Sequence, residues 1–417
     1  MPVRLHRRTV LKGAAAASAA AFVGLPTSGR AWAAPSDRKF LFLFASGGWD
    51  TAQVFEPKFG GAEGVDLPPL SEPGQIGDLR FVAGPDRPEV ARYFARWGHR
   101  SAIVNGIDTH SIGHGSGTRF VLTGTSASTS PDWPTRLADA DPIALPMPHV
   151  VFSGPAFAGG LGASVVRGGD GRLLELIDGS IVGRSGAPAS VPASPVDAMI
   201  DAVVHEQNAR FRGASRARVA AEHEESLERA MELEGRLFEA GLGETTAGLL
   251  GTALRAVDLM RLGLARCAMV RIPGRWDTHG DNTPQTRQFG ALFGALDRLQ
   301  EHLATTPGDH APTLADEIVV VALSELGRTP RLNGGGGKDH WPYTSALVAG
   351  PGVAGGRTLG ATDDGLQAVP IDFATGRPSA AGDMLGTEHL GAALLRLGGV
   401  DPATSLPGVQ VLRALLA

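Results

Sequence analysis

The sequence predicts an α/β fold: a doubly wound, mostly parallel sheet with helices on both faces. Short apolar runs alternate with segments of helical periodicity, which is the order typical of a parallel sheet. The run over residues 39–45 is almost entirely apolar, as expected for a central strand covered on both sides. Polar residues cluster directly after several of these runs, and in such sheets ligands gather at the carboxyl ends of the strands.

The predicted strands are short and rich in apolar residues. After the first, they cover residues 101–105, 149–152, 267–272, 317–323 and 345–349. Each is followed by glycine or polar residues, which favour loops. We expect a polar loop over residues 106–118 and a flexible glycine-rich loop over residues 334–337.

Helical periodicity marks residues 246–262 and 286–303, and a short helical turn over residues 119–124 ends at a glycine. Between about 195 and 245 the chain is dense in Ala, Glu and Arg, with apolar residues at helical spacing. Sustained heptads are missing there, which disfavours a coiled coil. We therefore expect residues 34–417 to form a single domain with a helical insertion at about 195–245.

The first 33 residues are typical of an export signal. Arg7 and Arg8 precede a weakly hydrophobic, Ala- and Gly-rich stretch that ends in Ala31-Trp32-Ala33. This is a basic region, an apolar region and an A-x-A cleavage site, and the paired arginines indicate the twin-arginine machinery as partner. The apolar part is too short and too rich in glycine for a membrane anchor. We therefore expect the protein to be periplasmic or secreted.

Charge and cysteine content exclude several classes of function. The formal net charge is −5, and removal of the signal, which carries five basic and no acidic residues, would take it to −10. An acidic chain is not expected to bind nucleic acid or an anionic membrane. No further run is long and apolar enough to predict a membrane span. Cys267 is alone and lies in an apolar run, so we expect a small buried side chain without a disulfide or thiolate cluster.

Acidic residues and histidines follow the predicted strands in a repeated pattern. The candidate metal ligands are Asp50, Asp277, His279, Glu325, Asp339 and His340. Carboxylate and imidazole groups together hold a divalent cation, which polarises phosphoryl or sulfuryl oxygens. Ligation without cysteine suits zinc, manganese or magnesium. Taken alone, Asp50 after two glycines also fits a helix N-cap.

The order of these motifs resembles the DUF1501 family of exported proteins, in the alkaline phosphatase and sulfatase superfamily. The matching segments are the paired arginines and residues 47–50, 277–279, 324–328, 339–340 and 347–356. The resemblance implies an alkaline-phosphatase-like fold and a site for two adjacent metal ions. Two departures leave the number at one or two: Leu326 stands where a histidine usually follows the acid, and Asp277 and His279 are two residues apart instead of four.

Residues 119–124 are similar to the stretch that follows the sulfatase nucleophile. This resemblance implies Ser116 as the attacking group, with Thr118 and then Thr51 as alternatives. His114 would be a ligand, an acid or base, or a substitute for the nucleophile. Arg328 could bind an anionic group through its planar guanidinium, or simply pair with Glu325 at a helix start.

The expected function is therefore an exported, metal-dependent hydrolase of phosphate or sulfate esters, with a small molecule or a glycan ester as substrate. The alternatives are a metal- or ligand-binding protein without catalysis, and a metal-dependent phosphomutase or transferase. Trp49, Trp276 and Trp341 adjoin the proposed ligands. They could line the pocket and stack on a sugar, or could equally be ordinary packing.

Overall fold

The computed structural model describes residues 32–60, 64–168 and 248–417, with short stretches between residues 180 and 221. Almost all of the signal predicted over residues 1–33 lies outside these ranges. The same holds for most of the helical insertion predicted at about 195–245. Both therefore remain predictions from the sequence.

An eight-stranded sheet forms the centre of the fold, in the order β14-β4-β13-β10-β1-β9-β5-β6. Its strands are β1 Lys39–Ala45, β4 Ser101–Asp108, β5 His149–Val151, β6 Val165–Arg167, β9 Cys267–Arg271, β10 Ile318–Ser324, β13 Tyr343–Ala349 and β14 Arg357–Leu359. Strand β1 pairs in parallel with both β9 and β10. Parallel pairing recurs between β5 and β6, β5 and β9, and β14 and β4. The predicted α/β class with a mostly parallel sheet is confirmed.

Strand β13 runs against its neighbours. It pairs antiparallel with β10, where Ala346 lies opposite Leu323, and antiparallel with β4, where Tyr343 lies opposite Asp108. Because β13 is reversed, its first residue lies at the edge where β1, β4, β9 and β10 end. Side chains just before β13 therefore meet side chains just after the parallel strands.

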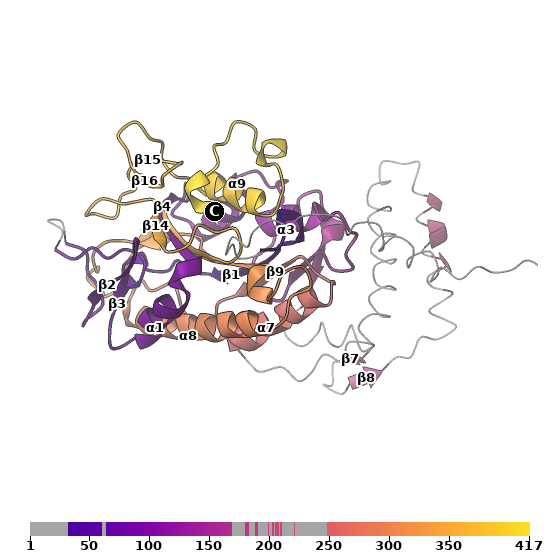
Figure 1. Ribbon diagram of the computed structural model, residues 1–417, viewed down its shortest axis with the longest axis horizontal. Coiled ribbons are helices and arrows are strands. Elements are labelled where there is room, and N and C mark those ends of the chain that lie inside the picture. Colours follow the sequence, from indigo (N-terminus) through magenta and orange to yellow (C-terminus); the bar gives the residue numbers. More distant parts are fainter. Residues whose placement is uncertain are drawn as a thin grey trace, which may run out of the picture. The chain divides into compact units, whose positions relative to one another are not determined.

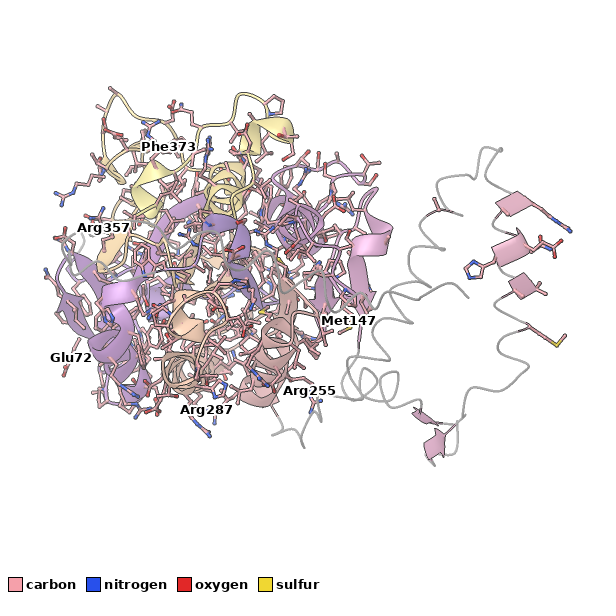
Figure 2. The ribbon with its side chains drawn as sticks, turned by 45° about the vertical axis from the view of Figure 1, so that its right-hand side comes forward. Glu72, Met147, Arg255, Arg287, Arg357 and Phe373 are labelled. Carbon is pink, nitrogen blue, oxygen red and sulfur yellow. The ribbon has the colours of Figure 1, made fainter. Side chains whose placement is uncertain are left out.

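Helices cover both faces of the sheet, and Figure 1 shows α1, α7 and α8 on one side and α3 and α9 on the other. The helices are α1 Pro88–Trp97, α2 His114–Thr123, α3 Trp133–Asp139, α7 Gly248–Arg261, α8 Thr283–Thr305 and α9 Thr387–Leu397. Arg287 on α8 and Phe373 mark these two sides in Figure 2. Helices α7 and α8 lie where the sequence predicts them, although α8 is longer at both ends. Helices α1, α3 and α9 are not among the predicted ones.

Alternation along β1 explains why both faces must be covered. Phe40, Phe42 and Phe44 pack in a core with residues of α2, α3 and α9. Leu41 and Leu43 pack in a second core with residues of α1, α7 and α8. Successive side chains of a strand point to opposite faces, so an uninterrupted apolar strand needs a layer on each side. Burial of each such side chain contributes about 1.5–3 kcal/mol relative to exposure.

Helix α2 begins earlier than the sequence predicts. The expected loop over residues 106–118 ends at Gly113, and the helix starts at His114. Its end is as predicted, because Gly124 adopts a left-handed φ of 71° that caps the helix. The early start matters because it places His114 in the first turn of a helix.

Short elements complete the described chain. The two-stranded pairs are β2 Glu72–Ile76 with β3 Leu79–Ala83, β7 Ser180–Val182 with β8 Pro188–Ser190, β11 Gly327–Arg328 with β12 His340–Trp341, and β15 Ile371–Asp372 with β16 Arg377–Pro378. The 3-10 turns are η2 Pro35–Asp37, η3 Thr51–Gln53, η4 Gly98–Arg100, η5 Gly162–Ser164, η6 Leu314–Asp316, η7 Pro402–Thr404 and η8 Arg413–Leu415. The β11–β12 pair places Arg328 opposite His340.

Two of the three tryptophans near the predicted ligands belong to the core. Trp49 and Trp276 are fully buried, with ring centroids 5.0 Å from Phe55 and 5.1 Å from Phe289, respectively. Trp341 is half-buried and donates its indole N–H to the Leu366 carbonyl. For the first two, packing is the correct alternative.

Cys267 is buried as predicted, and burial raises the pKa of its thiol. Among the helices that the structure describes, none combines the length and the apolar character that a membrane crossing requires.

Candidate metal centre

A cluster of three histidines and one aspartate lies at the carboxyl edge of the sheet. Asp277 and His279 come from the loop after β9, and His114 from the start of α2, which follows β4. His340 precedes the reversed strand β13. Sheet topology therefore brings together residues that are far apart in the sequence, at the edge where ligands of such folds bind.

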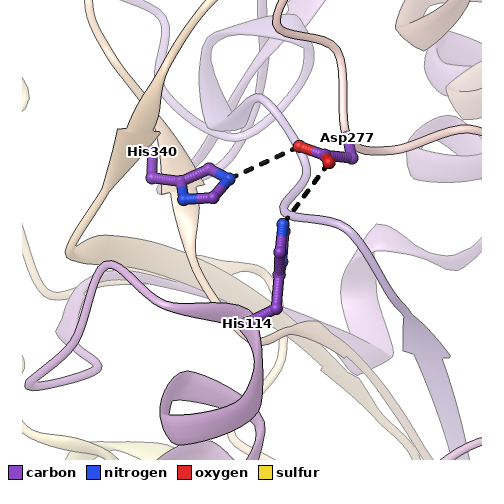
Figure 3. Close-up of side chains that lie close together, drawn as sticks. All are labelled: His114, Asp277 and His340. Atoms are coloured by element: carbon purple, nitrogen blue, oxygen red, sulfur yellow. Dashed lines mark hydrogen bonds and ion pairs between the residues drawn. The ribbon is translucent and has the colours of Figure 1, made fainter.

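Asp277 is the centre of this cluster, as Figure 3 shows. Its Oδ2 lies 3.5 Å from His114 Nε2, and its Oδ1 lies 3.4 Å from His340 Nε2. One candidate ligand atom from each of the three residues lies within 4.8 Å of the other two. This spacing is suited to a cation between them.

His279 adds a third imidazole. Its Nε2 lies 3.1 Å from Asp277 Oδ1 and 2.9 Å from His340 Nε2. The two imidazole rings have centroids 4.5 Å apart. Asp277 Oδ1 is thus close to two imidazole nitrogens at once.

The opposite nitrogen of each imidazole, Nδ1, has an acceptor of its own. His114 Nδ1 lies 2.8 Å from Glu325 Oε1, His279 Nδ1 lies 2.9 Å from Asp339 Oδ1, and His340 Nδ1 lies 2.6 Å from the carbonyl oxygen of Ile112. A carboxylate or carbonyl oxygen can only accept, so each Nδ1 carries the proton. In the neutral rings this leaves a lone pair on all three Nε2 atoms, which is how proteins orient metal-binding histidines.

Arg328 holds the Asp277 carboxylate in place. Its Nη2 donates to Asp277 Oδ1 at 2.6 Å and also to the carbonyl oxygen of Trp276 at 3.2 Å. Desolvation alone would raise the pKa of Asp277, but the hydrogen bond and charge of Arg328, with His340 and His114, lower this pKa to about 2. Asp277 is therefore a carboxylate at any ordinary pH.

The pKa values of two cluster histidines move in opposite directions. The hydrogen bond to Glu325 raises the pKa of His114 despite its partial burial. Desolvation lowers the pKa of His340, with a further contribution from the positive charge of Arg328. The side chains of His114, Asp277 and His279 are 39%, 49% and 45% exposed, so a ligand from solvent can reach the cluster.

Residues 37–375 match the family described as "Protein of unknown function (DUF1501)". The chain belongs to the DUF1501 family. No curated protein matches this DUF1501 member in sequence.

Several solved structures are similar to this DUF1501 chain. One is a protein of the alkaline phosphatase superfamily from Vibrio parahaemolyticus, with 11% identity, a TM-score of 0.34, and coverage of 94% of this chain and 72% of that one. A sulfatase from Pseudoalteromonas sp. has 11% identity, a TM-score of 0.35, and coverage of 91% and 72%. A protein solved in complex with its substrate D-glucosamine-2-N,6-O-disulfate has 10% identity, a TM-score of 0.36, and coverage of 91% and 80%.

Among the residues predicted as ligands, Asp277, His279 and His340 meet in this DUF1501 cluster, whereas Glu325 and Asp339 lie behind it. The Glu325 side chain is fully buried, and it accepts from the Gly47 amide at 2.6 Å and from Ser324 Oγ at 3.1 Å. Asp339 accepts from His279 Nδ1. The prediction of direct ligation is corrected for both: each carboxylate faces the far nitrogen of a histidine and orients it.

Asp50 is not part of the cluster either. Its carboxylate is fully buried and lies 2.9 Å from the Lys338 ammonium, and it also accepts from the amide of Ala52 in η3. The N-cap interpretation of Asp50 is therefore correct, and the predicted role as a metal ligand is not supported, because a lysine takes the place of a cation.

The predicted anion-binding role of Arg328 is also corrected. Its side chain is fully buried, and every nitrogen of its guanidinium donates to the protein. The acceptors are the carbonyl oxygens of Gly47, Gly48, Trp276 and Lys338, and the carboxylate of Asp277. With its donors in use, Arg328 positions Asp277 and the surrounding loops.

Ser116, the predicted nucleophile, does not point at the cluster. Its hydroxyl lies 2.5 Å from Ser111 Oγ and 3.2 Å from the carbonyl oxygen of Gly113. Residues two apart on a helix are about 200° apart around its axis, so Ser116 faces away from His114. His114, which the sequence left open between a ligand, an acid or base and a substitute for the nucleophile, is a member of the cluster.

Two supporting groups escape prediction from the sequence. The first is the carbonyl oxygen of Ile112, because a backbone oxygen leaves no motif. The second is Asn333, whose side-chain amide donates to the His279 carbonyl at 2.9 Å and to Asp339 Oδ1 at 3.2 Å. Asn333 Oδ1 also accepts from the amides of Gly335 and Gly337.

The glycine-rich segment over residues 334–337 is bound to the cluster loop and is not the free loop that the sequence predicts. A Cβ atom on Gly337 would collide with the backbone of His279. The Gly336 carbonyl accepts from the amide of Asn282 at 3.0 Å. Glycine is required here for close backbone approach. A cavity of about 660 Å³ lies elsewhere, lined by residues of α7 and α8, and shares no residue with the cluster.

Proposed function

We propose that this DUF1501 protein binds one divalent cation through His114, Asp277, His279 and His340 and hydrolyses phosphate or sulfate esters. One observation carries the proposal: three imidazole Nε2 atoms converge on a single carboxylate while every Nδ1 is occupied elsewhere. In this arrangement the lone pairs of the Nε2 atoms and of the carboxylate face one another and repel. A cation bound between them would remove this repulsion.

The donor set fits a transition metal. Three imidazole nitrogens and one carboxylate oxygen suit zinc, manganese or iron, whereas magnesium and calcium prefer a shell of oxygen atoms. Of the three metals predicted from the sequence, magnesium is therefore the least suited. Each histidine of the cluster also has a hydrogen-bond acceptor at its Nδ1. Such acceptors are typical of metal-binding sites and are not expected for charged residues that are near one another by chance.

When bound, the cation would supply Lewis-acid chemistry by polarising an ester oxygen and stabilising the charge that develops on it. The protein contributes orientation. Glu325, Asp339 and the Ile112 carbonyl hold the three rings, and Arg328 keeps Asp277 ionised.

The start of α2 supports an anionic substrate. His114 is the first residue of this helix, and Gly113 before it offers no side-chain cap. The first amides of a helix lack internal partners and carry a partial positive charge, so they favour phosphate or sulfate. The substrate class follows from this feature together with the cation, and a small molecule or a glycan ester would fit.

Water is the attacking group that the cluster favours. Among the side-chain contacts of the described residues, no hydroxyl or thiol bonds to His114, Asp277, His279 or His340. A mutase or transferase that passes a group through a serine or threonine at the cluster is therefore less well supported than a hydrolase. Binding of a metal without catalysis is the remaining alternative.

Metal analysis and turnover test the proposal together. The purified mature protein should retain about one equivalent of transition metal, and aryl phosphate, phosphodiester and aryl sulfate substrates should show turnover that chelation abolishes and metal restores. A protein that retains the metal and turns over none of these esters would be the binding protein. A protein without bound metal would contradict the proposal altogether.

A further inference from the structure

Asp50 and Lys338 form an ion pair that is completely closed to solvent. Lys338 Nζ lies 2.9 Å from Asp50 Oδ2, and neither side chain has any exposed surface. The same oxygen accepts from Asn282 Nδ2 at 2.7 Å and Gln53 Nε2 at 3.4 Å, while Oδ1 accepts from the Ala52 amide at 3.1 Å. Four donors thus surround this carboxylate.

Lys338 is fixed from several directions. Its ammonium also donates to the carbonyl oxygen of Asp66 at 2.9 Å. Its backbone amide donates to the Thr278 carbonyl at 3.1 Å, and its own carbonyl accepts from Arg328 Nη1 at 2.9 Å. The lysine therefore belongs to the frame that joins the loop after β1 to the loop after β9.

A buried ion pair of this kind is stable only while both charged partners are present. Removal of one partner leaves an uncompensated charge in a site closed to solvent, which is strongly unfavourable. Hydrogen bonds at both ends of the Asp50–Lys338 pair satisfy most of their remaining lone pairs and protons. A divalent cation could reach Asp50 only by displacing the ammonium group.

Glu325 is the other buried carboxylate among the predicted ligands, and hydrogen-bond donors surround it as well. Glu325 accepts from the Gly47 amide, Ser324 Oγ and His114 Nδ1. In both Asp50 and Glu325, each carboxylate oxygen thus already accepts hydrogen bonds from the protein. The residues do not fit the second metal ion that the superfamily resemblance implies.

We infer that the centre holds a single cation and that the Lys338 ammonium is the permanent counter-charge of Asp50, in place of a second metal ion. The inference rests on the proposed function for the cation at the histidine cluster. The Asp50–Lys338 pair itself stands on its own geometry.

Metal counting gives the first test. With zinc or manganese in excess and unbound metal removed, wild-type protein and Asp50→Asn should each hold about one equivalent. Glu317→Gln is the matched control, because that carboxylate is equally buried and is paired with Lys39 at 3.2 Å. Two equivalents in wild type that fall to one in Asp50→Asn, but not in Glu317→Gln, would overturn the inference and leave the proposed function intact. No retained metal would overturn both.

A double-mutant cycle gives the second test, and it does not depend on metal. Lys338→Met should lower the denaturant midpoint strongly, because it leaves Asp50 charged and buried. The double variant Asp50→Asn/Lys338→Met should recover most of that loss. A double variant no more stable than Lys338→Met would show that the lysine does not compensate Asp50, and the inference would fail. If Lys338→Met does not fold, the folded double variant alone supports the pairing, and an unfolded one counts against it.

Discussion

The Nε2 atoms of His279 and His340 face each other at 2.9 Å. The Nδ1 proton of His279 goes to Asp339 and that of His340 goes to the Ile112 carbonyl. Two neutral rings in this state would present lone pairs to each other. A metal cation between them would remove this repulsion, and the nearby Asp277 carboxylate would supply a further ligand to it.

Removal of a ligand should remove the metal. His340→Ala and Asp277→Asn are each expected to weaken zinc or manganese affinity by about 100-fold or more, since loss of even a supporting residue commonly costs 10–100-fold. Competition with a chromophoric chelator measures the affinity. His302 lies in the last turn of α8, outside the cluster, and His302→Ala controls for the general loss of a histidine. Retention of wild-type affinity in both cluster variants would contradict the assignment.

Glu325→Gln should weaken metal binding without displacing a ligand. The amide oxygen can still accept from the Gly47 amide and from His114 Nδ1, but the negative charge that supports the Nδ1 proton of His114 is lost. We expect about 10- to 100-fold weaker binding, measured by the same competition, with unchanged secondary structure by circular dichroism. A complete loss of bound metal in an otherwise folded protein would instead indicate that Glu325 is a direct ligand.

Ser116→Ala separates the sequence-based nucleophile from the structure. Because the hydroxyl is bonded to Ser111 and the Gly113 carbonyl, the variant should keep its metal and its ester turnover within about twofold of wild type. Steady-state kinetics on the preferred ester substrate check this. A loss of turnover with full metal content would restore Ser116 as the attacking group.

The stability of the fold should depend on pH through His110. Hydrogen bonds to Asp108 and then Glu388 raise the pKa of His110 to about 10. A raised folded-state pKa stabilises the fold fully below the unfolded value of about 6.5 and loses that effect as the pH rises through about 10. The stability difference between wild type and His110→Gln should therefore be largest near pH 6 and should shrink towards pH 10.

Chemical denaturation at several pH values gives this profile. His310→Gln, which replaces an exposed loop histidine, serves as the control for the loss of a histidine. A His110→Gln difference that stays constant from pH 6 to pH 10 would exclude the ion pairs as its source. His110 has a left-handed φ of 54°, and its backbone amide donates to Asp108 Oδ1 at 2.7 Å, a bond that the glutamine variant can also make.

Export by the twin-arginine route is testable at the paired arginines. Arg7→Lys/Arg8→Lys should leave the full-length precursor inside the cell, because the machinery recognises the arginine pair itself. Arg30→Lys keeps the same charge outside the pair and should be exported normally. Cell fractionation followed by immunoblotting distinguishes precursor from mature protein. Normal export of the double variant would point to a different route.

The fold class and the edge that carries the site could be predicted from the sequence. The strand over residues 39–45 is apolar throughout, and only a strand with a layer on each face has that pattern. The direction of β13 could not be predicted, since a short strand such as the one predicted over residues 345–349 looks the same in both directions. That reversal is what brings His340 to Asp277, His279 and His114.

The residue types of the site could be predicted better than their roles. Asp277, His279 and His340 meet as expected, but Glu325 and Asp339 are equally acidic and sit one layer behind. Sequence does not reveal which side of an imidazole a carboxylate will face. Lys338 could not be recognised as the partner of Asp50 either, because nearly 290 residues separate the two in the chain.

The reversed strand β13 would also make a bound cation important for the stability of the fold. Its four proposed ligands come from three segments that are far apart in the chain, beginning at His114 and ending at His340, and strand pairing across the sheet brings these segments together. A metal ion there would cross-link the first and last thirds of the domain. It could bind tightly only after β4, β10 and β13 have paired in the sheet. Bound metal would then protect the chain from proteolysis and raise its unfolding temperature with metal concentration, as for any ligand specific to the folded state. Metal retention would thus report that folding is complete.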